Sequence, residues 1–129
     1  MSKGHVFVYG TLKVGGFYAE EFNHVRLSSK PAQIEGILLD LDVFPGIKTG
    51  VDGCVYGEIH EYDQFEDVVR NMDVIEGYFG PESEHNLFKR IKVIATDENE
   101  KEMEVIAYEF AQDLPDEKER VVESGIWDI

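Results

Sequence analysis

The sequence predicts an α+β domain in which a mixed or antiparallel β-sheet curls towards a barrel and is accompanied by a few helices. Three observations carry this prediction: several β-branched and aromatic segments, one strongly amphipathic helix, and a polar hairpin connection between two of the segments. The chain of 129 residues is close to the usual size of one domain and contains no internal repeat, linker or low-complexity tract. We therefore expect a single domain across residues 1–129.

Short apolar segments bounded by turn-forming residues are the expected strands. These strands are predicted over residues 5–9, 33–40, 54–60, 88–96 and 103–110. The turn signals between them are Gly10, Phe44-Pro45-Gly46, Asp52-Gly53 and the polar run at 97–101. The short run at 97–101 joins the last two strands directly, which predicts an antiparallel hairpin.

Residues 63–76 form the clearest predicted helix. Asp63 followed three residues later by Glu66 resembles a capping box, and Gly77 supplies a stop signal. Apolar residues recur at helical spacing at Phe65, Val68, Val69, Met72 and Ile75. A second, short helix is expected within residues 17–25.

The charge of the chain excludes several classes of function. Its 12 Lys and Arg against 27 Asp and Glu give a formal net charge of −15. Nucleic acids and anionic membranes are both bound through basic surfaces, so we expect neither as a partner. Residues 97–129 hold 12 acids and 3 bases. We interpret that stretch as a solvated acidic face, with a binding role as the alternative.

Location and assembly follow from the same composition. No apolar run approaches the roughly 20 residues of a membrane span, and the first residues lead straight into a strand with no secretory signal. We therefore expect a cytoplasmic protein. The self-repulsion of a strongly acidic chain favours a monomer, or at most a weak homodimer.

Cysteine and histidine give no sign of a metal site. The one cysteine, Cys54, is interpreted as a small buried hydrophobe in a reducing compartment. His5, His24, His60 and His85 do not have the paired spacing of metal ligands. We therefore predict no metal ion.

Glu76 breaks two local rules at the end of the predicted helix. At about 100° per residue it falls about 20° from Phe65 around the helix axis, in the middle of the apolar stripe. It also lies at the helix C-terminus, where the helix dipole disfavours a negative charge. Both effects would raise the pKa of its carboxyl towards the range of a general acid or base. The alternative is a frayed helix end with Glu76 pointing to water.

The first strand ends in a second candidate feature, made of Tyr9, Gly10, Thr11 and Leu12. A glycine-containing turn after a strand can direct successive backbone N–H groups into one space and bind an anion, and Thr11 adds a hydroxyl. A plain tight turn is the alternative.

Several segments together resemble a known family. In order, they are Val6-Phe7-Val8-Tyr9-Gly10-Thr11-Leu12-Lys13, Phe44-Pro45-Gly46-Ile47, Val55-Tyr56-Gly57-Glu58-Ile59, Met72-Asp73-Val74-Ile75-Glu76-Gly77-Tyr78, Phe88-Lys89-Arg90-Ile91-Lys92-Val93, Ala107-Tyr108 and Ser124-Gly125-Ile126-Trp127. Their order and spacing resemble those of the γ-glutamylcyclotransferase-like (AIG2-like) superfamily over nearly the whole chain.

The resemblance implies a small closed or nearly closed β-barrel with a cavity beside the loop Tyr9–Leu12. It implies that Glu76 is the catalytic acid and base and that Tyr9, Gly10, Thr11 and Leu12 bind the substrate. The implied substrate is a small γ-glutamyl amide, either a γ-glutamyl amino acid or a γ-glutamylamine. Its cyclisation gives 5-oxoproline and a free amine, as in glutathione metabolism, without a metal or organic cofactor.

One residue departs from the family pattern. Phe88 stands where the family usually has Tyr, so any hydrogen bond from that phenol is lost. Tyr78 and Tyr108 are the candidates to compensate, and all three residues are expected in the cavity wall. The departure favours an alternative function, a non-catalytic protein of the same fold that binds a small carboxylate ligand.

Overall fold

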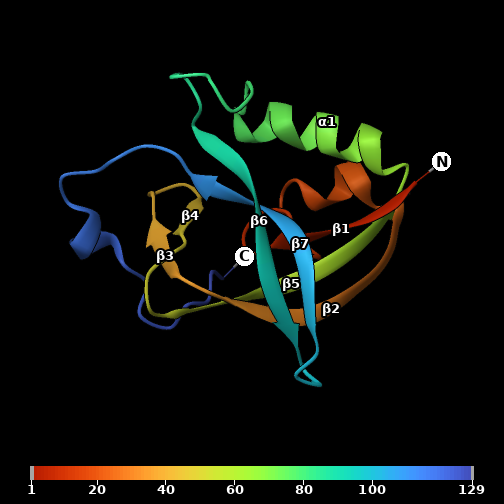
Figure 1. Ribbon diagram of the computed structural model, residues 1–129, viewed down its shortest axis with the longest axis horizontal. Coiled ribbons are helices and arrows are strands. Elements are labelled where there is room, and N and C mark those ends of the chain that lie inside the picture. Colours follow the sequence, from red (N-terminus) through yellow and green to blue (C-terminus); the bar gives the residue numbers. More distant parts are fainter. Residues whose placement is uncertain (1, 129) are drawn as a thin grey trace.

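Five strands close into a barrel in the computed structural model, which describes residues 2–128 (Figure 1). Their order around the barrel is β1-β5-β2-β6-β7, and a separate hairpin, β3-β4, lies beside it. The strands are β1 (Lys3–Val8), β2 (Arg26–Glu35), β3 (Ile37–Asp40), β4 (Pro45–Lys48), β5 (Cys54–Asp63), β6 (Phe88–Asp97) and β7 (Glu102–Phe110). The helices are α1 (Phe65–Glu76) and the 3₁₀ turns η1 (Ala19–Phe22) and η2 (Glu117–Arg120). The predicted α+β class is confirmed.

The barrel is antiparallel except at one seam. There β1 runs parallel to β7 and meets it at a single pair, Val6 with Ile106. Elsewhere, most of the hydrogen bonds between strands come from three antiparallel pairs: the long hairpin β6-β7, β1-β5 and β2-β5. Because every strand has two neighbours, the barrel leaves no open edge.

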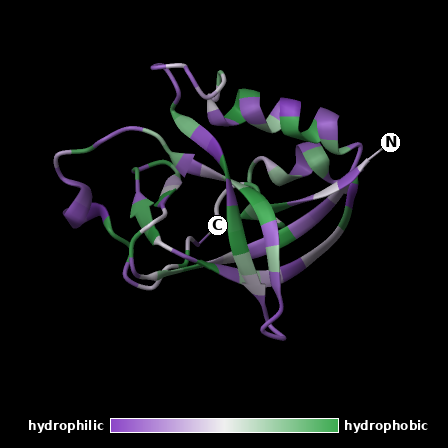
Figure 2. Ribbon diagram, in the orientation of Figure 1, coloured by the Kyte–Doolittle hydropathy of each residue, from purple (hydrophilic) through white to green (hydrophobic). Residues whose placement is uncertain are grey.

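Alternate residues of the strands form two hydrophobic clusters. One lies inside the barrel and includes Phe7 of β1 and Ile59 of β5. The other joins the outer face of the strands to α1 and η1. Figure 2 shows the matching alternation of hydrophobic and hydrophilic residues along α1, whose Val68 and Met72 are buried against this outer cluster. Both sides of the sheet are therefore covered where α1 lies.

The start of α1 differs from the prediction. The helix begins at Phe65, and its N-cap residue is Gln64 in a left-handed conformation (φ 53°). Asp63 accepts the N–H of Gln64, and Glu66 pairs with the hydroxyl of Ser2. The predicted capping box is therefore wrong, because both of its side chains have other partners. The stop at Gly77 is confirmed, with φ 65° and its N–H on the carbonyls of Asp73 and Val74.

Four other sequence predictions need correction. The predicted strand at 33–40 is two strands, because Gly36 at φ 151° breaks the chain between them. The turn assigned to Phe44-Pro45-Gly46 lies earlier, so that Pro45 and Gly46 already belong to β4. The helix expected within 17–25 is only the 3₁₀ turn η1. Cys54, expected to be buried, is half-buried.

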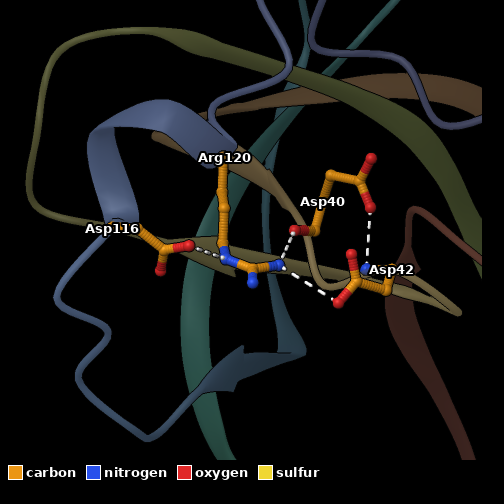
Figure 3. Close-up of polar contacts among 4 residues, drawn as sticks. All are labelled: Asp40, Asp42, Asp116 and Arg120. Carbon is orange, nitrogen blue, oxygen red and sulfur yellow. Dashed lines mark hydrogen bonds and ion pairs between the residues drawn. The ribbon is translucent and has the colours of Figure 1, made fainter.

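A cluster around Arg120 fixes the connection between β3 and β4 (Figure 3). Arg120 donates to the carboxylate of Asp116 at 3.0 Å and to the backbone carbonyl of Asp40 at 3.0 Å. It also approaches the carboxylate of Asp42 at 3.5 Å, and the N–H of Asp42 donates to the side chain of Asp40 at 2.8 Å. The acidic C-terminal stretch thus supplies the cation that holds the turn leading to Phe44. Among residues 2–128, no helix is long and apolar enough to cross a membrane.

Candidate functional site

A pocket opens between the C-terminal end of α1, the end of β1 and the first residues of β6. Its wall is formed by Phe7, Val8, Tyr9, Gly10, Thr11, Leu12, Tyr18, Phe44, Pro45, Ile75, Glu76, Leu87, Phe88 and Tyr108. Most of these side chains are apolar or aromatic, and Glu76 is the charged member of the set. The structure therefore brings the loop Tyr9–Leu12 and the helix end at Glu76, which are far apart in the sequence, into one cavity.

Glu76 is half-buried in this wall as the last residue of α1. Burial raises the pKa of its carboxyl to about 7. Within residues 2–128, no hydrogen bond or ion pair joins its carboxylate to another side chain or to the backbone. The helix continues to this residue, so the alternative of a frayed end pointing into water is not what the structure shows. A carboxyl with a pKa near neutrality can take up and return a proton at physiological pH.

Asp73, one turn earlier, has the opposite environment. Its carboxylate accepts the phenol of Tyr108 at 2.6 Å and pairs with the guanidinium of Arg90, also at 2.6 Å. Arg90 lies over the ring of Tyr78, 5.2 Å from its centre. Tyr9 completes the network by donating its phenol to the backbone carbonyl of Tyr108 at 2.6 Å. Asp73 therefore ties α1 to β6 and β7 directly behind the pocket.

The tyrosines of the network also respond to Glu76. Burial, followed by the charge of Glu76, holds the pKa of Tyr9 well above its usual value. Burial and the hydrogen bond to Asp73 raise the pKa of Tyr108, with a smaller contribution from Glu76. Both phenols are therefore neutral at physiological pH. Each already donates its hydrogen bond, Tyr9 to the carbonyl of Tyr108 and Tyr108 to Asp73.

The loop after β1 is folded by tight contacts at its glycines. A Cβ on Gly10 would lie 2.5 Å from Pro45 Cγ, and one on Gly16 would lie 2.3 Å from the carbonyl oxygen of Thr11. The loop is closed by the N–H of Lys13 on the Gly10 carbonyl at 3.0 Å and by the N–H of Tyr18 on the Thr11 carbonyl at 2.9 Å. These carbonyl oxygens accept hydrogen bonds within the loop. They are acceptors and therefore do not themselves bind an anion.

The N–H groups of Gly10, Thr11 and Leu12 remain as donors. Within residues 2–128 none of the three donates a hydrogen bond to another protein group, although Gly10 and Leu12 are buried. Buried backbone N–H groups nearly always have a partner, whether protein, water or ligand. An anionic group in the pocket is one partner of suitable chemistry for them.

The predicted site residues are mostly, but not all, in this pocket. Glu76, the loop Tyr9–Leu12, Phe88 and Tyr108 line it, whereas Tyr78 does not line it and lies beneath Arg90 instead. Tyr78 is thus not among the residues that line this pocket, and its expected place in the cavity wall stays a prediction.

Three residues around the pocket received no role from the sequence. Asp73 and Arg90 lie within segments that resemble the family, three residues before Glu76 and two residues after Phe88, and this spacing alone marks them in the sequence. Tyr18 was assigned to a helix, yet it lines the pocket. Its hydroxyl bonds to no other residue in the described part of the chain. Residues 2–128 also contain no group of three or more His, Cys, Asp or Glu side chains placed to hold a metal ion.

Comparison with known proteins defines the class to which this fold and pocket belong. The model of the family "gamma-glutamyl cyclotransferase, AIG2-like" matches residues 6–129. The chain belongs to that family.

Particular relatives agree with this assignment. The chain is 36% identical over 89 residues to gamma-L-glutamyl-butirosin B gamma-glutamyl cyclotransferase of Niallia circulans, a match that covers 68% of this chain and 55% of that protein. The chain thus spans little more than half the length of this curated relative.

Solved structures show the same fold. An AIG2-like protein from Mus musculus superposes with a TM-score of 0.76 at 21% identity, covering 99% of this chain and 90% of that one. YkqA from Bacillus subtilis superposes with a TM-score of 0.71 at 18% identity, covering 98% of this chain and 40% of the other. At these identities the likeness concerns the fold alone.

Proposed function

We propose that this protein cyclises a γ-glutamyl amide to 5-oxoproline and releases a free amine. The observation that carries the proposal is the unpartnered carboxyl of Glu76, with a pKa raised to about 7, in one cavity with the free N–H groups of Gly10, Thr11 and Leu12. Family membership and the name of the relative from Niallia circulans support the same reaction.

The reaction requires little machinery because both reacting groups belong to the substrate. The α-amino nitrogen attacks the γ-carbonyl carbon, a new C–N bond closes the five-membered ring, and the original amide C–N bond breaks. Holding the substrate in the ring-closing conformation supplies much of the rate acceleration. The aromatic wall around Phe88 and Phe44 suits this task, since it excludes water and limits the space available to the chain.

Glu76 moves the protons in this scheme. Its ionised carboxylate takes a proton from the substrate ammonium, which frees the nitrogen lone pair for attack. The protonated carboxyl then gives that proton to the departing amine nitrogen. The ring nitrogen must lose a second proton to become the lactam N–H. The carboxylate carries this proton to the released amine as well, which leaves as an ammonium ion. Glu76 ends the cycle ionised, and no water is consumed. A pKa near 7 suits both steps, because neither protonation state is costly to reach.

The loop after β1 binds negative charge in this scheme. The substrate has an α-carboxylate, and its γ-carbonyl oxygen becomes an oxyanion as the ring closes. The N–H groups of Gly10, Thr11 and Leu12 and the Thr11 hydroxyl are the donors that the pocket offers to these oxygens. Since the loop is already folded by its own hydrogen bonds, these donors need no rearrangement when charge develops.

The lining of the pocket bears on the leaving group. Within residues 2–128 no Lys or Arg lines the cavity. A γ-glutamyl amino acid carries a second carboxylate on its leaving group, which would enter an apolar pocket beside Glu76 without a cation. A γ-glutamylamine carries no such charge. We therefore propose an amine, rather than an amino acid, as the leaving group.

A binding protein of the same fold is the second candidate, favoured by the missing phenol at Phe88. Tyr108 does not replace that phenol, because its own hydroxyl donates to Asp73. Tyr18 has the available hydroxyl in the wall, and it is the residue that would have to compensate in an enzyme.

Release of 5-oxoproline tests the proposal. The purified protein is incubated with γ-glutamyl amides of matched size whose leaving groups do or do not carry a carboxylate, beside a mock preparation from cells lacking the gene. We expect product from the amines, and a lower kcat/KM with the amino acids. Ligand-induced thermal shifts without product from any amide would support the binding protein instead.

A further inference from the structure

A polar strip lies on the outer face of β5, beneath the segment that follows β1. It is made of Glu58, His60 and Tyr62, which alternate along the strand and therefore share one face. His60 and Tyr62 are fully buried. The ring of Phe22 from η1 meets that of Tyr62 edge to face, with the centres 5.9 Å apart. These side chains lie apart from the pocket lining, and the mechanism proposed above does not use them.

The three side chains form one continuous hydrogen-bonded chain. The Tyr62 hydroxyl lies 2.8 Å from His60 Nδ1, and His60 Nε2 lies 2.7 Å from Glu58 Oε1. The same carboxylate oxygen accepts the backbone N–H of Val14 at 3.0 Å. This series of hydrogen bonds therefore connects the buried core to the loop that lines the pocket.

When His60 is neutral and Glu58 is ionised, one tautomer of the imidazole satisfies both ring contacts. An ionised Glu58 accepts only, so His60 carries its proton on Nε2. The bare Nδ1 then accepts the Tyr62 hydroxyl. Burial lowers the pKa of His60, and the nearby guanidinium of Arg26 on β2 acts in the same direction against the effect of Glu58. A neutral imidazole with a fixed tautomer thus orients the Glu58 carboxylate.

The hydrogen bond at Val14 belongs to a loop whose other backbone hydrogen bonds are mainly internal. The N–H groups of Lys13, Gly16 and Tyr18 all donate to carbonyls within residues 10–18. Among residues 2–128, two hydrogen bonds leave this segment for other parts of the fold: the Val14 N–H donates to Glu58, and the Lys13 ammonium donates to the carbonyl of Trp127 at 2.6 Å. Of these, the contact to Glu58 is the one made by the loop backbone to the barrel wall.

We propose that Glu58 and His60 are positioning residues for the pocket loop. His60 orients Glu58, Glu58 holds the backbone at Val14, and the segment 10–18 thereby keeps Gly10, Thr11 and Leu12 in place in the cavity wall. The consequence for catalysis rests on the function proposed above, whereas the consequence for the loop itself does not.

Hydrogen exchange tests the loop directly. In Glu58→Ala, amides within 11–18 should exchange at least about tenfold faster than in wild type, because a hydrogen bond to a charged acceptor is lost. Glu61→Ala is the matched control on the same strand, since within residues 2–128 the Glu61 carboxylate makes a single ion pair, with His5 at 3.8 Å. The control should leave this segment unchanged. Unchanged exchange in Glu58→Ala would overturn the proposal.

A second pair of variants separates orientation from simple packing. His60→Gln keeps an amide donor for Glu58, whereas His60→Leu fills the space without one. We expect His60→Gln to retain most of the loop protection and His60→Leu to lose it. If His60→Leu does not fold, His60→Gln decides by itself, because loss of protection in a folded His60→Gln protein contradicts the assigned donor role.

Kinetic constants distinguish a positioning role from a general loss of stability, which would not change KM selectively. For an amide that the wild type cyclises, Glu58→Ala should raise KM by about tenfold and lower kcat less, since the loop binds substrate. An equal loss of kcat with KM unchanged would contradict a positioning role. If the wild type forms no 5-oxoproline from any amide, the proposed function fails, while the exchange measurements still decide whether Glu58 and His60 hold the loop.

Discussion

Two carboxylates on the last turn of α1 have contrasting environments. Asp73 is partnered by the phenol of Tyr108 and by Arg90, whereas Glu76, three residues later, has no protein partner among residues 2–128. Both are partly buried. Burial without a partner raises the pKa of Glu76 to about 7, while the Asp73 carboxylate is held by two partners at 2.6 Å.

The contrast separates a carboxylate that holds the structure together from one that is available for chemistry. A paired carboxylate is stabilised in one protonation state and contributes to folding. An unpaired buried carboxylate destabilises the fold when it is charged, and is retained where its reactivity is useful. The pocket places the second kind next to free backbone donors and the first kind behind the wall.

The largest expected effect is on turnover. Glu76→Gln should lower kcat by roughly 10²- to 10⁴-fold for the amide that the wild type cyclises, because the proton carrier is removed. The measurement is release of 5-oxoproline by folded protein, with Glu84→Gln as the control, since Glu84 is exposed in the loop after α1. Full activity of Glu76→Gln would remove Glu76 from the mechanism.

The second effect is on the pH dependence of stability. Folding raises the pKa of Glu76 from 4.5 to about 7, so between these values the folded state binds more protons than the unfolded state. The free energy of unfolding therefore falls as pH rises through this window, by up to about 3 kcal/mol. Glu76→Gln should remove that fall, so that the variant gains stability relative to wild type at pH 8.

Urea denaturation at pH 5 and pH 8 measures this difference, with Glu84→Gln as the control. The control should retain the wild-type pH dependence. An identical pH dependence in wild type and Glu76→Gln would mean that Glu76 titrates normally, and would break the contrast with Asp73.

The partnered carboxylate should show the reverse pattern. Asp73→Asn loses the ion pair with Arg90 and weakens the bond from Tyr108, so we expect about 1–3 kcal/mol of lost stability. Asp67→Asn is the matched control, because Asp67 forms an exposed ion pair with Arg70 on the same helix. The control should cost less than about 1 kcal/mol. Equal losses of stability in the two variants would show that the network behind the pocket stabilises the fold no more than an exposed ion pair does.

The sequence predicted the features that depend on local pattern. The strands with strong apolar character, the amphipathic helix and its glycine stop all follow from spacing and residue type. The unusual position of Glu76 followed from the same helical geometry. The long strand β2 was missed at its start, because Arg26 to Pro31 is polar and includes a proline. Its place in the barrel comes from pairing with β5, which no local pattern reveals.

The site was predictable only where one segment carried the signal. The loop Tyr9–Leu12 and Glu76 were each visible alone, but the network of Asp73, Arg90 and Tyr108 joins three elements. Sequence spacing gives no information about such contacts. The capping box failed for a related reason, since Ser2 offered Glu66 a partner from the far end of the chain.

The smallest expected effect concerns the missing phenol. Phe88 is buried between the rings of Phe44 and Phe110, with centres 5.9 and 5.6 Å away, and it lines the same pocket as Glu76. Phe88→Tyr adds a hydroxyl that can donate to the unpartnered carboxylate. A hydrogen bond to the charged form lowers a pKa, so we expect that of Glu76 to fall by less than about one unit.

This change would make Glu76 resemble Asp73 more closely, because both carboxylates would then accept a phenol. Titration of Glu76 by carbon NMR measures the pKa whether or not the protein is an enzyme. The control is Phe79→Tyr, which adds the same hydroxyl to an exposed ring (70% accessible) outside the pocket lining. An unchanged or higher pKa in Phe88→Tyr would mean that position 88 directs its phenol away from Glu76. The loss of tyrosine there would then have no bearing on the proton carrier.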